Sequence, residues 1–127
     1  MNNTSCILIV DDDPGVRFML LRAVEGLGHR AETAGSRSEA CARLRGARFD
    51  AVISDIQMES PDAGVRLVDD ARRLQPDIPF ILLTGGPTMA TVGAALRSGV
   101  CDYLAKPFAI ADFISAVDLA LGIDRVI

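Results

Sequence analysis

The chain carries three adjacent carboxylates, Asp11 to Asp13, directly after the apolar segment 6–10, which reads CILIV. Like charges side by side cost free energy unless a positive charge lies among them. Mg²⁺ removes that cost because it binds oxygen ligands, usually one or two carboxylates together with water and a phosphate oxygen. We therefore interpret the acidic run as part of a site for a hard divalent cation.

Three other chemically useful side chains, those of Asp55, Thr84 and Lys106, come at or just after the ends of short apolar segments. Lys106 is the only lysine of the chain, which has twelve arginines. An ammonium and a hydroxyl beside a carboxylate would neutralise and hydrogen-bond the oxygens of an incoming phosphoryl group. Asp55 could then act as a nucleophile toward phosphorus and form an acyl phosphate. This prediction requires a fold that brings these residues together.

Short apolar segments alternate with amphipathic ones along the whole chain. We predict strands at 6–10, 30–34, 51–54, 80–84 and 102–105. Four of the five are apolar or β-branched nearly throughout, which is typical of parallel strands covered on both faces. The second, which reads RAETA, is the least typical strand.

Helical periodicity fills the intervals between these strands. The first predicted helix has Asp13 as its N-cap, Pro14 in its first turn and Arg17 on its outer side. Its apolar face is formed by Val16, Met19, Leu20, Ala23, Val24 and Leu27.

Four more helices are predicted. The second begins at a capping box of Ser36 and Glu39 and ends near Gly46. Helices at 64–74, 88–98 and 110–121 follow, and Gly122 ends the last one. The face of that last helix comprises Ile110, Phe113, Ile114, Val117 and Leu121.

This alternation predicts a doubly wound α/β fold of the flavodoxin-like type, with five helices and a five-stranded parallel sheet in the order 2-1-3-4-5. Residues 1–127 are expected to form a single domain. Ligands of such sheets bind beyond the carboxyl ends of the strands. The acidic run, Asp55, Thr84 and Lys106 are all predicted to lie there.

Composition excludes several classes of protein. The net charge of −4 disfavours a nucleic-acid surface, and no apolar run is long enough to span a membrane. Because no signal peptide is visible, we expect a cytoplasmic protein. The three cysteines lack metal-binding spacing and are interpreted as reduced, and His29 is expected to be solvated or to cap the first helix.

The segments ILIVDDDP, SDIQM, LLTGG and DYLAKPF resemble those of the receiver domains of bacterial two-component response regulators, including chemotaxis-type single-domain receivers. The resemblance spans essentially the whole chain. It implies that Asp55 accepts a phosphoryl group from a phosphohistidine of a sensor histidine kinase or phosphotransfer protein. Asp12 would bind Mg²⁺ or Mn²⁺ directly and Asp11 through water, with Asp55 and the backbone carbonyl of Gln57 completing the protein ligands.

The resemblance also implies a conformational switch. Thr84 would be the switch hydroxyl, Lys106 the lysine that pairs with the phosphate, and Tyr103 the aromatic residue that changes rotamer. The bond between Lys106 and Pro107 would be cis, which is tolerated before proline. Signalling to an output domain, a partner protein or a second copy would use the face of the fourth helix, fifth strand and fifth helix. Catalysis would be limited to self-phosphorylation and slow autodephosphorylation.

One stretch departs from the family pattern. After the phosphoacceptor the family usually reads MPxxDG, whereas this chain reads MESPDAG, so that Pro61 is displaced and Gly64 comes one position late. Because this loop borders the expected metal site, the change bears on the path of the loop and on the lifetime of the phosphoryl group.

Two other classes of protein compete with this interpretation. Asp11 and Asp13 form a D-x-D pair after the first strand, as in haloacid-dehalogenase-type phosphatases, although that motif normally continues to Thr or Val where this chain has Gly15. A flavin electron carrier would share the fold but needs a phosphate-cradling loop after the first strand. Here that loop is acidic and would repel a phosphate.

Overall fold

The computed structural model describes residues 5–86, 93, 97, 99 and 102–123 of the chain. The helix predicted at 88–98 lies outside the described residues, apart from two isolated positions within it. Every other predicted helix and strand falls inside them.

Five parallel strands form one sheet in the order β2-β1-β3-β4-β5, as predicted. The strands are β1 (Cys6–Val10), β2 (Arg30–Ala34), β3 (Ala51–Asp55), β4 (Phe80–Thr84) and β5 (Asp102–Ala105). The third strand is one residue longer than predicted, so Asp55 belongs to the strand itself. Strand β2 lies at an edge of the sheet and is only partly buried, which accounts for its polar sequence.

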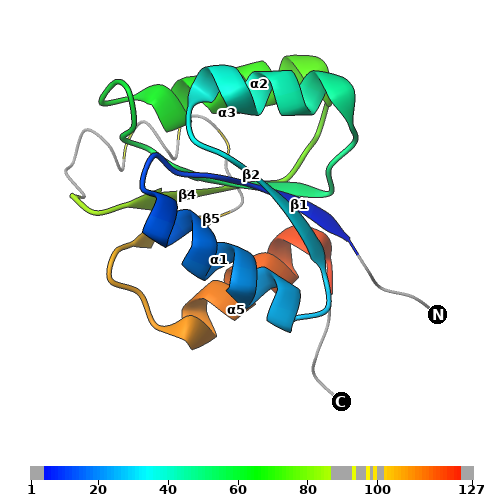
Figure 1. Ribbon diagram of the computed structural model, residues 1–127, viewed down its shortest axis with the longest axis vertical. Helices are drawn as coiled ribbons and strands as arrows, with labels where there is room; N and C mark the ends of the chain where they lie inside the picture. The colour runs from blue at the N-terminus through cyan, green and yellow to red at the C-terminus, as the bar shows by residue number, and fades with distance from the viewer. Residues whose placement is uncertain (1–4, 87–92, 94–96, 98, 100–101, 124–127) are drawn as a thin grey trace.

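Helices cover both faces of the sheet. They are α1 (Pro14–Gly26), α2 (Arg37–Gly46), α3 (Ala63–Leu74) and α5 (Ile110–Leu121). Figure 1 shows α2 and α3 on one face of the sheet and α1 and α5 on the other. Within the described residues, no helix has the length and hydropathy needed to cross a bilayer.

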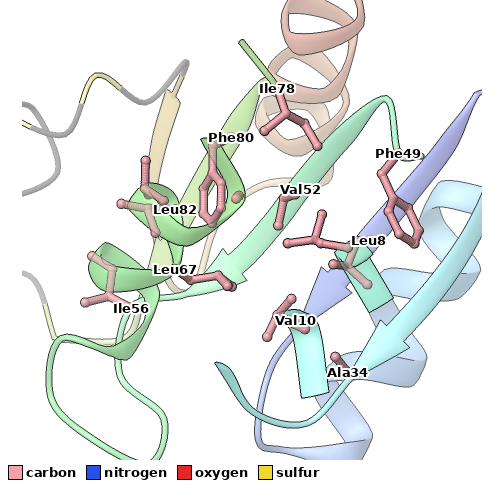
Figure 2. Packing of buried hydrophobic residues seen from close by; sticks show 14 residues of the cluster. Leu8, Val10, Ala34, Phe49, Val52, Ile56, Leu67, Ile78, Phe80 and Leu82 are labelled. Atoms are coloured by element: carbon pink, nitrogen blue, oxygen red, sulfur yellow. The ribbon is translucent and has the colours of Figure 1, made fainter. Parts of the chain in front are cut away.

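Successive residues of the strands point into two separate cores. Leu8, Val10, Val52 and Leu82 point toward α2 and α3, where they pack with residues such as Leu67 (Figure 2). The intervening residues Ile7, Ile9, Ile53, Ile81 and Leu83 pack on the other side with α1 and α5. Burial on both faces explains why the central strands are apolar throughout.

The predicted helix N-caps are confirmed for α1 and α2. Asp13 Oδ1 accepts the backbone N–H of Gly15 at 2.8 Å, and Ser36 Oγ accepts the N–H of Glu39 at 3.1 Å. The carboxylate of Glu39 accepts the N–H of Gly35. Side-chain oxygens thus satisfy N–H groups at the start of both helices, which have no partner within the helix.

Some predictions for single side chains were wrong. Met19 and Ile110 were assigned to the buried helix faces but are 55% and 60% exposed. Each lies at the margin of an apolar stripe, where periodicity alone does not determine burial. His29 is buried rather than solvated, and its Nδ1 accepts the N–H of Ser5 at 3.2 Å, so it contacts the start of β1.

Candidate functional site

The carboxyl ends of the strands bring the predicted residues together at one edge of the sheet. Asp11 follows β1, Asp55 and Thr84 end β3 and β4, and Lys106 follows β5. The Lys106 Nζ lies 3.0 Å from Asp11 Oδ2 and 3.5 Å from Asp55 Oδ2. A single ammonium therefore joins two carboxylates that come from different strands.

The carboxylates of Asp11, Asp12 and Asp55 form a compact group. Each offers one oxygen, and these oxygens lie within 4.8 Å of one another. Asp11 and Asp55 are buried, with 1% and 8% of their surface exposed, whereas Asp12 is exposed. The group thus reaches from the protein interior to the surface, as a site with access for an ion or a phosphoryl group requires.

Burial and neighbouring charges act on these groups in opposite directions. Burial raises the pKa of Asp55, the Lys106 charge opposes that rise, and the Asp11 charge adds to it, so the pKa lies above its ordinary value. Burial lowers the pKa of Lys106, but its hydrogen bond to Asp11 and the Asp55 charge outweigh this, and the net shift is upward. Lys106 is therefore held as an ammonium beside two acidic groups.

A divalent cation fits this group of residues. Asp55 Oδ1 is buried and has no hydrogen-bond partner among the described residues. A buried carboxylate oxygen without a partner is costly. The neighbouring donors, Asp11 and Asp12, are hard oxygen ligands of the kind that Mg²⁺ prefers. The single ammonium of Lys106 compensates only part of the negative charge of these carboxylates.

Thr84 lies at the end of β4, next to the carboxylates and fully buried. Its hydroxyl oxygen accepts the N–H of Gly86 at 3.2 Å, and its carbonyl accepts the N–H of Lys106 at 2.7 Å. The peptide bond between Lys106 and Pro107 is cis, as the family resemblance implied.

The loop that departs from the family pattern still delivers its glycine to the site. Gly64 N donates to the Ile56 carbonyl at 2.8 Å, and a Cβ at Gly64 would lie 2.1 Å from the carbonyl oxygen of Asp55. The loop at 57–62 turns through a bond from Met58 N to the Ser60 carbonyl. The additional residue is thus accommodated in the loop, and α3 begins against the end of β3.

Asp13 is not part of the carboxylate group. Its Oδ1 accepts N–H groups of Gly15 and Val16 as the N-cap of α1. The phosphatase interpretation required Asp13 as an acid in the site, and this interpretation was therefore wrong. The physical reason is that a short acidic side chain just before a helix is used to satisfy the free N–H groups there.

Two other predicted residues lie near the site. Gln57 comes two residues after the end of β3 and is exposed, and the role of its backbone carbonyl as a ligand stays a prediction. Tyr103 lies on β5 and packs against the core under α2 and α3. Its hydroxyl is already buried, without a hydrogen-bond partner among the described residues.

Sequence reasoning missed one contact of the site, because Arg17 was assigned to the outside of α1. Its guanidinium instead donates to the backbone carbonyl of Asp11 at 2.7 Å. A signal was present, since a cation in the first turn of a helix opposes the helix dipole. Such a residue needs a compensating contact.

Comparisons with known proteins agree with this geometry. The family model described as response regulator receiver domain matches residues 7–118. The DNA-binding transcriptional regulator NtrC of Azospirillum brasilense is 30% identical over 120 residues, which cover 94% of this chain and 25% of that protein. This chain therefore spans about a quarter of the length of that relative.

Two solved structures are similar in both fold and sequence. The receiver domain of the sensor histidine kinase PA1611 from Pseudomonas aeruginosa, with a magnesium ion in its active-site cleft, has a TM-score of 0.83 and 26% identity, and the match covers 94% of this chain and 98% of that one. A response regulator from Burkholderia pseudomallei with a phosphorylated aspartic acid, a calcium ion and citrate has a TM-score of 0.80 and 27% identity, covering 91% of this chain and 69% of that one.

Proposed function

The chain belongs to the family of response regulator receiver domains, and on that basis we propose that Asp55 is its phosphoacceptor. The observation that carries this proposal is the position of Asp55, which is buried at the end of β3, with its Oδ2 3.5 Å from the Nζ of the only lysine of the chain. The phosphorylated aspartic acid of the Burkholderia pseudomallei protein supports the same chemistry.

The proposed reaction transfers a phosphoryl group from a phosphohistidine. A carboxylate oxygen of Asp55 attacks phosphorus and an O–P bond forms while the P–N bond breaks, its electron pair returning to the imidazole nitrogen. Lys106, 3.5 Å from Asp55 Oδ2, neutralises negative charge on the phosphoryl oxygens. Thr84 is a hydrogen-bond donor to one of these oxygens.

Mg²⁺ is the proposed cofactor, and Mn²⁺ could replace it. Asp11, Asp12 and Asp55 would hold the ion, together with the backbone carbonyl of Gln57. When bound, the ion neutralises charge on the phosphoryl group during transfer. Two observations support this assignment: Asp55 Oδ1 has no hydrogen-bond partner among the described residues, and the Pseudomonas aeruginosa receiver holds a magnesium ion.

We further propose a sensor histidine kinase or a phosphotransfer protein as the phosphoryl donor. Signalling would pass to an output domain, a partner protein or a second copy of the chain. The proposed surface includes β5 and α5, and the exposed apolar side chains of Ile110 and Leu119 on α5 support its use in binding. The fourth helix of that surface falls outside the described residues.

Phosphorylation by acetyl phosphate with Mg²⁺ tests the assignment of Asp55. We expect one phosphoryl group per chain, released by hydroxylamine as acyl phosphates are, and no incorporation in Asp55→Asn. Asp69→Asn is the matched control, because Asp69 is exposed on α3, away from the strand ends. Intact mass spectrometry measures the result, and equal incorporation in Asp55→Asn and the unmodified protein would exclude Asp55 as the acceptor.

A further inference from the structure

Arg17 occupies an unusual place for a cation. It lies in the first turn of α1, where the helix dipole disfavours positive charge. Its side chain is half-buried, and its Nη1 donates to the backbone carbonyl of Asp11 at 2.7 Å. The guanidinium is therefore directed at the loop that carries the acidic pair.

Gly35 provides the space for this guanidinium. A Cβ at Gly35 would lie 2.9 Å from Arg17 Nη1, closer than side-chain carbons approach their neighbours. The backbone around Gly35 is held in place, because its N–H donates to Glu39 Oε1 at 3.2 Å and the Ala34 carbonyl accepts the N–H of Asp11 at 3.1 Å. A larger residue at position 35 would therefore displace the guanidinium.

The contact from Arg17 fixes one of the two peptide planes that flank Asp12. The carbonyl of Asp11 and the N–H of Asp12 share a planar peptide unit, so a hydrogen bond to that carbonyl fixes the plane. The N–H of Asp13 donates to Asp11 Oδ1 at 3.0 Å and fixes the next plane. Both planes around the Asp12 Cα are thus held.

We propose that Arg17, seated against Gly35, is a positioning residue that orients Asp12 toward Mg²⁺ by holding the peptide plane between Asp11 and Asp12. The inference rests on the proposed Mg²⁺ site. Asp12 is exposed, and within the described residues its carboxylate has no hydrogen bond or ion pair that would orient it. The backbone therefore sets the direction in which the Asp12 side chain leaves the chain, and the contacts from Arg17 and Asp11 hold that backbone.

The charge of Arg17 and its position have opposite effects on Mg²⁺ affinity. A fixed cation near a divalent ion repels it, so removal of the guanidinium would strengthen Mg²⁺ binding if only charge mattered. Loss of a group that orients a metal ligand weakens binding, commonly by tenfold or more. The sign of the change therefore distinguishes the two effects.

The experiment measures the Mg²⁺ dissociation constant at fixed ionic strength by the shifts of backbone amide signals. We expect this constant to rise about tenfold in Arg17→Met and in Gly35→Ala. Because both substitutions remove the same contact, the dissociation constant of the double variant should not exceed the larger of the two single-variant values. Phosphorylation of Asp55 at saturating Mg²⁺ should stay close to that of the unmodified protein. In the metal-free protein, the amide signals of Asp12 and Asp13 should shift in both variants.

Two matched controls distinguish the effect of the Arg17 position from two other effects. One is the loss of a positive charge, and the other is the addition of a methyl group to a glycine. Arg22→Met removes the same charge from an exposed site on the same helix, where the guanidinium lies over the Phe18 ring at 6.0 Å. Gly46→Ala adds a methyl group that meets nothing within 4 Å. Both controls should leave the dissociation constant within about twofold, because exposed charges are screened by solvent.

Equal or tighter Mg²⁺ binding in Arg17→Met would overturn the inference. If that variant does not fold, Gly35→Ala decides alone, since it keeps the charge and only displaces the guanidinium. Absence of Mg²⁺ binding in the unmodified protein would instead overturn the proposed metal site, and the inference with it.

Discussion

Lys106 is the residue that allows two buried carboxylates to face each other at the end of the sheet. Asp11 and Asp55 are both buried, and each would be costly as an isolated charge. The ammonium of Lys106 contacts both. The protonation equilibria of these three groups are therefore coupled, so that a change in the charge of any one of them alters the pKa values of the other two.

Another buried carboxylate, that of Asp70, connects α2 and α3. Asp70 Oδ2 lies 2.6 Å from Arg37 Nε, and Oδ1 accepts a hydrogen bond from Arg73. The hydrogen bond from Arg37 outweighs burial and holds the pKa of Asp70 below its ordinary value of 3.8. Burial and the neighbouring Asp70 charge raise the pKa of the Cys41 thiol, which is consistent with an unreactive cysteine.

The Asp70 network predicts a pH dependence of stability. A carboxyl whose pKa is lowered on folding stabilises the protein above its unfolded pKa of about 3.8, and this contribution is lost as the pH falls through the lowered value. We expect Asp70→Asn to reduce the free energy of unfolding by about 1 kcal/mol at neutral pH, since its arginine partners are partly exposed. The difference should shrink below about pH 4.

Urea unfolding at neutral pH and at about pH 3 measures this difference. Asp69→Asn, an exposed neighbour on α3, should have little effect at either pH. A difference between Asp70→Asn and the unmodified protein that grows as the pH falls would contradict the prediction.

At the scale of elements, α3 can begin in close contact with the end of β3 because Gly64 has no side chain. The Gly64 Cα lies so close to the Asp55 carbonyl that a methyl group would lie 2.1 Å from the oxygen and 2.7 Å from the Ile56 Cα. Both neighbours are backbone atoms, one in the last residue of the buried strand β3 and the other in the residue directly after it. The position of α3 and that of Asp55 are thus linked.

Gly64→Ala is therefore expected to destabilise the fold, by about 1–3 kcal/mol as overpacked substitutions do. It should also reduce phosphorylation of Asp55, because the strand end must shift. Gly26→Ala in α1 is the control, since its methyl group meets nothing within 4 Å and alanine favours the helix by about 0.5–1 kcal/mol. Urea unfolding and acetyl phosphate labelling measure both effects, and a Gly64→Ala protein as stable as the control would exclude the close contact.

The elements that could be predicted from sequence are those with a strong local pattern. Central strands buried on both faces are apolar throughout, and the caps at Asp13 and Ser36 depend on neighbouring residues alone. The burial of Met19 and Ile110 was predicted wrongly because the apolar periodicity of a helix does not show where its buried face ends.

At the scale of the whole molecule, the site could be predicted because parallel topology brings strand ends to one edge. Lys106 and Asp11 lie 95 residues apart in sequence, and only the strand order joins them. The partners of Arg17 and Arg37, which are the Asp11 carbonyl and Asp70, could not be identified from the sequence, although the place of Arg17 in the first turn of α1 indicated that it needs a partner. These contacts depend on how close a side chain comes to a loop or to another helix. The periodicity of the sequence gives no information on such distances.

The contacts of Thr84 at this edge of the sheet indicate how a phosphoryl group on Asp55 would change the structure. The Thr84 hydroxyl accepts a hydrogen bond from Gly86, and its own hydrogen is not donated to any described residue. A phosphoryl oxygen on Asp55 would be a charged acceptor for it. Movement of Thr84 would pull on β5, whose residue Ala105 pairs with Thr84, and would disturb the packing of Tyr103 two residues earlier.

We therefore expect beryllium fluoride with Mg²⁺, a phosphoryl mimic, to shift the amide signals of Thr84 to Gly86 and of Tyr103. In Thr84→Ala the shift at Tyr103 should be lost while acetyl phosphate still labels Asp55, because the hydroxyl couples the site to β5 and is not the nucleophile. Thr33→Ala on the edge strand β2 is the matched control and should keep both responses. Shifts confined to the loop at 11–13 and to Asp55 in the unmodified protein would show that the phosphoryl signal does not leave the site through Thr84.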